Sequence, residues 1–240
     1  MLKMSLPNKD AYLHLLKNYL MTEKKKFPTT ILAFSIIFII GVFIAYFIQK
    51  KDRLPIYNPA DINPSLVDES IRNVDHDHRI QSFSLINQLG DTITESTFEG
   101  KIYVADFFFT TCMNICPKMS KQMDRAAKEF KDDKEVMFIS HSVTPESDSV
   151  SVLAAYAELY GADPSKWMLV TGDKKEIYDL ARKFYFAVTS NGKGDSTDFI
   201  HTENFVLIDK EKRIRGFYDG TSSKEVDQLI DDIRILQKEY

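Results

Sequence analysis

An uncharged, apolar segment near the N-terminus places the firmest constraint on this chain. No charged residue occurs from Phe27 to Gln49, and Ile31 to Ile48 consists almost entirely of Ile, Phe, Ala and Val. About 20 such residues in a helix, which rises about 1.5 Å per residue, cross the roughly 30 Å hydrocarbon core of a bilayer. Because apolar residues occupy every face and lysines flank both ends, a buried core helix fits poorly. We therefore predict a transmembrane anchor over residues 28–49.

The residues around this segment predict how it sits in a membrane. A cleavable signal peptide would have a shorter apolar stretch, closer to the start and followed by small residues, so a retained anchor fits better. Six lysines precede the span, whereas Lys50, Lys51 and Arg53 are the basic residues just after it. The positive-inside rule then makes residues 1–27 a short cytoplasmic segment. We expect a single-pass inner (cell) membrane protein whose C-terminal domain is periplasmic or otherwise extracytoplasmic.

The remainder of the chain is expected to form a spacer and one domain. Pro55, Pro59 and Pro64 with scattered Asn and Asp predict an extended linker over residues 50–79. From residue 80 to 240, strand and helix patterns alternate, which predicts an α/β thioredoxin-like fold with a central mixed sheet flanked by helices. Strands are expected near residues 83–86, 92–94, 101–109, 136–139, 167–170, 204–208 and 214–218, and helices over 117–131, 148–160, 174–184 and 223–238.

Charge argues against nucleic acid as a partner, and the cysteine count points to chemistry. The net charge is −4, and no block of Lys or Arg interleaved with aromatics follows residue 60. The chain has two cysteines, Cys112 and Cys116, whereas a disulfide-stapled secreted domain would have more, spread along the chain. A permanent disulfide of this spacing is within reach but closes too small a loop to stabilise much.

The cysteine pair lies where a predicted strand gives way to a helix. Exposed amides and the helix dipole at that position lower the pKa of a thiol and favour the thiolate. Thiolate is the nucleophile of redox chemistry and also the soft ligand that Cu(I) prefers, so the position supports both functions. Met119 and Met123 could be soft ligands, but their helical spacing on an apolar face favours a place in the core.

The five histidines differ in what their positions predict. His14 lies on the expected cytoplasmic side. His76 and His78 alternate with Asp in a short polar tetrad, which favours a solvated loop over an accessory copper-loading site. His141 ends a strand, and a polar strand-end residue is favoured over an approach to the cysteines.

His201 stands apart because it precedes the apolar strand expected at 204–208. In a thioredoxin-like fold the loop before that strand faces the cysteine turn and usually presents a cis-proline there. This chain has no proline after Pro164. A histidine at this position favours a metal over a substrate thiol.

Taken together, these residues resemble the Sco/SenC family, over roughly residues 80–240 and the single anchor before them. The resemblance lies in Cys112 to Pro117 as the CxxxCP motif, Ile139 to Asp148 as the strand-end signature, Trp167 with Thr171-Gly172, and His201 as the metal-binding histidine. Three positions depart from the family pattern: Thr144 and Ile200 stand where Asp is common, and Met113 replaces the Pro after the first Cys. None of the three departures removes a metal ligand, although groups that contact the ligands tune metal affinity and redox behaviour.

The resemblance implies a copper chaperone that helps to build the binuclear copper A site of cytochrome c oxidase. Cys112, Cys116 and His201 would hold copper as Cu(I) or Cu(II) and pass it to the oxidase subunit that carries this site, with other copper chaperones as further partners. Oxidation of the two thiols to a disulfide would release the metal.

Two enzyme functions compete with this reading. A thiol–disulfide oxidoreductase would use Cys112 and Cys116 as a catalytic redox pair that reduces the oxidase subunit's cysteines before metallation. The missing CxxC spacing and the missing proline count against it. A peroxiredoxin-like peroxidase fits less well, because its pattern has Thr where this chain has Met113.

Overall fold

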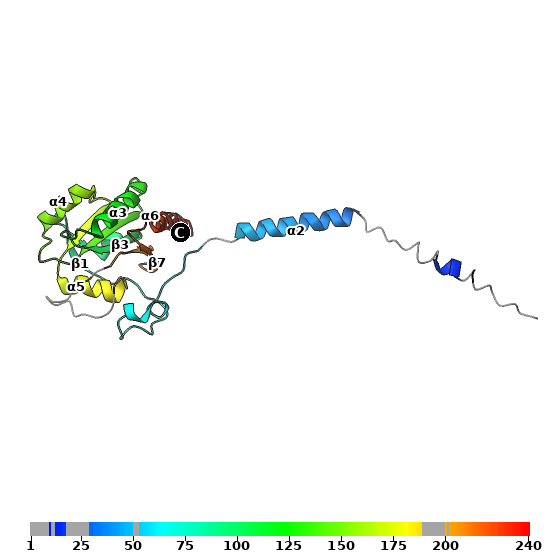
Figure 1. The fold of residues 1–240 in the computed structure, drawn as a ribbon, viewed down its shortest axis with the longest axis horizontal. Helices are drawn as coiled ribbons and strands as arrows, with labels where there is room; N and C mark the ends of the chain where they lie inside the picture. The colour runs from blue at the N-terminus through cyan, green and yellow to red at the C-terminus, as the bar shows by residue number, and fades with distance from the viewer. Residues whose placement is uncertain (1–9, 11–12, 18–28, 50–52, 189–199, 201) are drawn as a thin grey trace, which may run out of the picture. The chain divides into compact units, whose positions relative to one another are not determined.

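The computed structural model of the chain describes residues 10, 13–17, 29–49, 53–188, 200 and 202–240. They belong to two compact units, Met1–Asp52 and Arg53–Tyr240. In the first unit, α2 (Thr29–Gln49) is a single helix (Figure 1). Among the described residues, no helix combines the length and the apolar character that a membrane crossing requires. The predicted transmembrane span is therefore not confirmed.

A seven-stranded mixed sheet organises the second unit, as predicted. Its strands lie side by side in the order β2-β1-β5-β4-β3-β6-β7. The three central strands β3, β4 and β5 run parallel, while β6 and β1 add to them antiparallel on either side. The strands are β1 (Ser84–Asn87), β2 (Thr92–Thr94), β3 (Ile102–Phe108), β4 (Val136–Ser142), β5 (Trp167–Thr171), β6 (Asn204–Ile208) and β7 (Ile214–Asp219).

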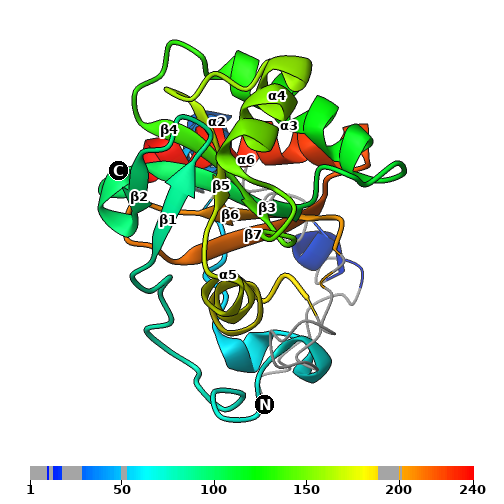
Figure 2. The same ribbon diagram turned by 90° about the vertical axis from the view of Figure 1, so that its left-hand side faces the viewer.

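Helices cover both faces of this sheet (Figure 2). One face packs against α3, α4 and α6, and the other against α5, η4 and the chain before β1. Every residue of β3 and β4 is buried, because helices and loops cover both faces of these central strands. The helical segments are η1 (Pro59–Asp61), η2 (Pro64–Leu66), η3 (Glu95–Phe98), α3 (Cys116–Glu129), α4 (Val150–Tyr160), α5 (Lys174–Asp179), η4 (Leu180–Phe184) and α6 (Ser223–Glu239).

The segment expected to be an extended linker is instead part of the second unit. We refer to residues 54–80 as the strap. Val67 is fully buried and Ile80 is 2% exposed, both within the core on the α5 side. The Tyr57 amide donates to the Ile214 carbonyl over 2.9 Å. Prolines do begin short 3-10 turns in this segment, but its apolar side chains bind it to the sheet.

The strap is held at its start by one buried guanidinium group. Arg215 on β7 donates to the Leu54 carbonyl over 2.8 Å and to the Pro55 carbonyl over 2.9 Å. The same side chain pairs with the carboxyl groups of Asp209 and Glu239. The expected boundary at residue 80 therefore moves to residue 53, where the compact unit begins.

Candidate metal centre

The cysteine turn joins the end of β3 to the start of α3, as predicted. Cys116 is the first residue of α3, and Pro117 occupies its first turn, where no amide proton is needed. The residue before the helix, Ile115, makes no side-chain cap. Instead, the Cys116 amide donates to the sulfur of Cys112 over 3.4 Å. The sulfur of Cys112 therefore lies at the positive end of the helix, where a negative charge is stabilised.

The two thiols differ sharply in environment. Partial burial acts to raise the pKa of Cys112, but amide hydrogen bonds from Asn114, Cys116 and Ile115 together outweigh it and lower that pKa. Cys116 is 2% exposed, and burial raises its pKa to about 12, with the neighbouring Cys112 adding to the shift. Both cysteines are free thiols in this structure. The metal-free site thus holds one sulfur ready to ionise and one that stays protonated.

This asymmetry predicts the alkylation of the reduced, metal-free chain. We expect iodoacetamide to modify Cys112 well before Cys116, because only the thiolate reacts. The rate at Cys112 should fall as the pH drops through its lowered pKa, whereas Cys116 should stay protonated until the pH nears 12. Peptide mass spectrometry over a pH series measures both rates. Equal rates at neutral pH, or faster modification of Cys116, would contradict the assignment.

A buried carboxyl group lies in β3, which leads to the turn, and a buried imidazole lies in the neighbouring strand β4. Burial raises the pKa of Asp106 on β3 to about 7, against a hydrogen bond from Ser140. His141 on β4 stacks on Phe107 with ring centroids 4.8 Å apart, and burial lowers its pKa to about 4. Asp106 Oδ1 and His141 Nε2 have no hydrogen-bond partner among the described residues. The ring of His141 packs against Phe83, Phe107 and Tyr185, which belong to the core on the sheet face opposite Cys116, so it does not approach the cysteines.

The other predicted candidates fall into three groups. Met119 and Met123 are fully buried, which confirms the expected core role. His76 is exposed, as expected of a loop residue, but His78 is buried, with Nε2 2.9 Å from the Phe184 carbonyl. The burial of His78 corrects the prediction of a solvated pair. Its ring packs against Phe184 and Phe186, and the folding of the strap places His78 beside them.

His201, the predicted third ligand, lies outside the described residues. Its neighbours Ile200 and Thr202 are buried. Within the described part of the chain, no group of three or more His, Cys, Asp or Glu side chains could hold a metal ion. The approach of His201 to the cysteine turn therefore stays a prediction.

One buried carboxyl group beside the turn was not singled out from the sequence. Asp148, just before α4, is fully buried, and the hydroxyl of Thr110 donates to it over 2.5 Å. The available signal was the recurrence of Ser and Thr at the ends of two adjacent central strands, where hydroxyl groups can meet a carboxylate.

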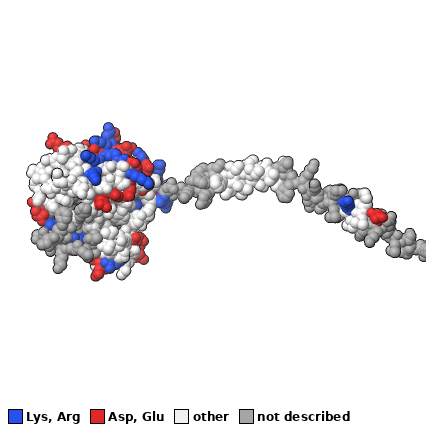
Figure 3. Space-filling model, viewed as in Figure 1, with Lys and Arg blue, Asp and Glu red and all other residues white. Residues whose placement is uncertain are grey.

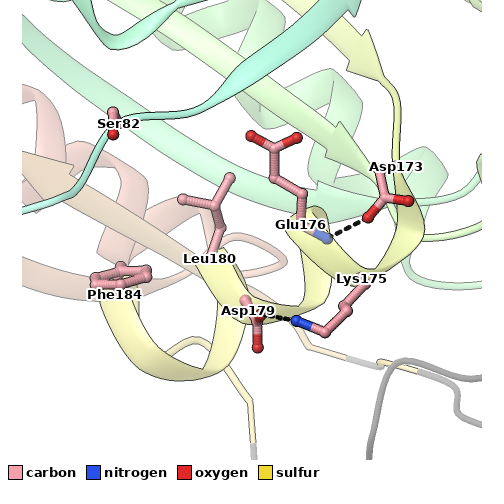
Figure 4. A pocket seen from close by; sticks show the side chains of 7 residues that line it. All are labelled: Ser82, Asp173, Lys175, Glu176, Asp179, Leu180 and Phe184. Atoms are coloured by element: carbon pink, nitrogen blue, oxygen red, sulfur yellow. Dashed lines mark hydrogen bonds and ion pairs between the residues drawn. The ribbon is translucent and has the colours of Figure 1, made fainter.

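A cavity of about 260 Å³ is present on the other side of the sheet, beside α5 (Figure 4). Polar groups that line the cavity make contacts that stabilise α5. Asp173 caps α5 by accepting from the Glu176 amide over 2.9 Å, and Lys175 pairs with Asp179 over 2.9 Å. Acidic and basic side chains are also intermixed over the face of the unit seen in Figure 3. The cavity is not part of the cysteine site.

Comparison with known proteins places this arrangement in a family. The sequence model described as SCO1/SenC matches residues 72–237. The chain is 30% identical over 159 residues to the SCO1 protein homolog of Bacillus subtilis (strain 168). This alignment covers 65% of the present chain and 82% of the relative.

Two solved structures extend the comparison. One is BsSco, described as a member of the Sco family of cytochrome c oxidase assembly proteins with a disulfide switch. It is 28% identical to this chain and superposes with a TM-score of 0.58, over 68% of this chain and 95% of BsSco. Copper-bound ScoI of Arabidopsis thaliana is 26% identical with a TM-score of 0.52, over 67% and 98%. The mixed sheet with flanking helices matches the thioredoxin-like fold of these relatives. The chain belongs to the SCO1/SenC family.

Proposed function

We propose that this chain is a copper-binding protein of cytochrome c oxidase assembly, which holds copper through Cys112, Cys116 and His201. The observation that carries the proposal is the pair of sulfurs brought together at the start of α3, with the Cys116 amide 3.4 Å from the Cys112 sulfur. Two thiolates and an imidazole form a donor set that suits Cu(I). Family membership and the copper-bound Arabidopsis relative give further support.

Each residue has a distinct part in this proposal. Cys112, partly exposed and with a lowered pKa, is the first sulfur that an incoming metal meets. Cys116 gives up its proton as the metal binds, since metal binding displaces protons from thiols. Soft ligands of the acceptor then replace these donors one at a time. The acceptor is the oxidase subunit that carries the copper A site, and another copper chaperone is a candidate donor.

The proposed setting is a membrane surface. The apolar segment over residues 28–49 acts as a single-pass anchor, with the N-terminus in the cytoplasm and residues 53–240 on the outer side. Its support is the uncharged run and the excess of lysines before it.

The proposal is tested by titrating the reduced, full-length chain in detergent with Cu(I), without oxygen and against a competing chelator. We expect one tightly bound Cu(I) per chain. His201→Ala should weaken binding by more than about tenfold, because even an outer partner of a ligand contributes 10–100-fold to metal affinity. Equal affinity of this variant and the parent would remove His201 from the ligand set. No tight binding by the parent would end the copper proposal.

A second function, thiol–disulfide exchange, is favoured by the unequal thiols. The Cys112 thiolate would attack a partner's disulfide, form a mixed disulfide and release one partner thiolate. Cys116 would then attack Cys112, closing the Cys112–Cys116 disulfide and releasing the second partner thiol. The test is whether the reduced, copper-free chain reduces a disulfide-containing peptide, and whether Cys116→Ser accumulates the mixed disulfide. If the chain does not reduce the peptide and Cys116→Ser accumulates no mixed disulfide, this second function is ruled out.

A further inference from the structure

The carboxyl group of Asp148 accepts hydrogen bonds from three residues, Thr110 after β3 and Ser142 and Thr144 at and after the end of β4. Its Oδ1 accepts from the Thr110 hydroxyl over 2.5 Å, and its Oδ2 accepts from the Ser142 hydroxyl over 2.6 Å and the Thr144 hydroxyl over 3.0 Å. The Thr110 amide also donates to Oδ2, over 3.2 Å. Asp148 and Ser142 are fully buried. A carboxylate at this depth needs these donors, since an unpaired buried charge is strongly unfavourable.

These contacts lie where the two central strands end. Phe108, the last residue of β3, is in register with Ser142, the last residue of β4, and the Val143 amide donates to the Phe108 carbonyl over 2.8 Å. Beyond this point the sheet no longer restrains the chain that leads to Cys112. Thr110, two residues before that cysteine, is tied to Asp148 by both its amide and its hydroxyl.

The geometry points to Asp148 as a positioning residue for copper, which acts through Thr110 to hold the cysteine turn against the end of β4. This inference rests on the proposed copper function. The turn sets the distance between the Cys112 sulfur and the Cys116 amide, and thereby the separation of the two sulfur ligands. A turn that moves at its first residue presents the pair in several arrangements, only some of which fit one metal ion. Among the described residues, the donors to the Asp148 carboxyl group are Thr110, Ser142 and Thr144, and none of these is a proposed copper ligand.

A purely structural role for Asp148 has to be separated from this one, and the chain offers a matched control. Asp209 is also fully buried, and its carboxyl group also accepts four hydrogen bonds, from the Glu211 and Arg213 amides and the Arg213 and Arg215 side chains. It follows β6, whose Ile208 is in register with Tyr103 near the start of β3. Asp209 therefore lies at the opposite end of the sheet from the cysteine turn.

The experiment compares Asp148→Asn with Asp209→Asn in the full-length, reduced chain. Cu(I) affinity is measured by chelator competition and stability by the urea midpoint. We expect Asp148→Asn to weaken Cu(I) binding about tenfold, at the lower end of the range for groups outside the ligand set. Asp209→Asn should lower the urea midpoint while its Cu(I) affinity stays within about twofold of the parent, because distant sites act independently. Equal Cu(I) affinities of the two variants would overturn the proposal.

Substitutions at Thr110 test the route by which Asp148 acts. Thr110→Val keeps the shape but removes the hydroxyl, and should weaken Cu(I) binding as much as Asp148→Asn does. Thr110→Ser keeps the hydroxyl and should retain the parent's affinity. The double variant with Asp148→Asn and Thr110→Val should bind Cu(I) no more weakly than either single variant, because both substitutions break the same contact between Thr110 and Asp148. Loss of affinity in Thr110→Ser, or additive losses in the double variant, would refute the tether.

A copper-free measurement separates this inference from the proposed function. If the parent binds no Cu(I), the copper function fails, and the rate of Cys112 alkylation at neutral pH then tests the tether alone. Asp148→Asn should slow that alkylation relative to Asp209→Asn, because the amides around the Cys112 sulfur are no longer held in place. The same rate in both variants would overturn the tether.

Discussion

Replacing Cys112 or Cys116 with serine is expected to remove tight Cu(I) binding altogether. Serine keeps the size and the turn but offers a hard hydroxyl in place of a soft thiolate, which Cu(I) does not favour. With one sulfur left, we expect affinity to fall by more than about a hundredfold, beyond what outer groups contribute. Cys116→Ser should be as damaging as Cys112→Ser, even though Cys116 is buried and protonated in the metal-free chain.

The measurement is Cu(I) competition with a chelator, on variants whose urea midpoints show that they remain folded. Met113→Leu is the matched control. Met113 is 92% exposed next to Cys112, so this change removes a neighbouring soft sulfur without touching the pair. We expect its affinity to equal that of the parent. Tight binding by both serine variants would place the copper elsewhere in the chain.

Arg215→Ala is expected to destabilise the domain by about 3–5 kcal/mol, the range found when one partner of a buried ion pair is removed. The Arg215 side chain is 2% exposed and pairs with Asp209, which is fully buried, and Glu239, which is 13% exposed. It also holds the carbonyl groups of Leu54 and Pro55. The variant thus leaves a buried carboxyl group and two backbone acceptors short of donors.

Urea unfolding of the full-length chain, followed by tryptophan fluorescence, measures this loss, because Trp167 is buried in β5. Arg213→Ala provides the comparison, since Arg213 binds the same Asp209 but is 21% exposed. Its effect should be about 1 kcal/mol, as for ion pairs near the surface. Equal effects of the two variants would show that the contacts of Arg215 to the strap contribute little.

The sequence predicted those parts of the fold whose pattern is local. The apolar run over residues 101–109 indicated a strand covered on both faces, and β3 is such a strand. The position of Cys116 at a helix start was readable for the same reason, since a strand pattern ended before it and a helix pattern began. Regular periodicity and short connections left few alternatives for this region.

Features that depend on contacts between distant segments were not readable in this way. The strap has no strand or helix period, and what folds it is the meeting of Val67 and Ile80 with the core, far along the chain. His78 looked like a loop residue because its polar neighbours hid its packing on Phe184. Asp148 gains its importance from hydroxyl groups on two other segments. The pairing of His201 with the cysteines stays a prediction.

The fastening of the strap also bears on how the chain responds to force. With the membrane anchor that we propose, any pull on the domain runs along the chain into Leu54 and Pro55, and from there through Arg215 into β7. Residues 54–80 could extend over roughly 90 Å if they were slack. They yield none of that length until the hydrogen bonds of Arg215 break and Val67 and Ile80 leave the core. The strap therefore extends only above a threshold force. A partner that pulls on the domain must first break these contacts before the domain can move farther from the membrane.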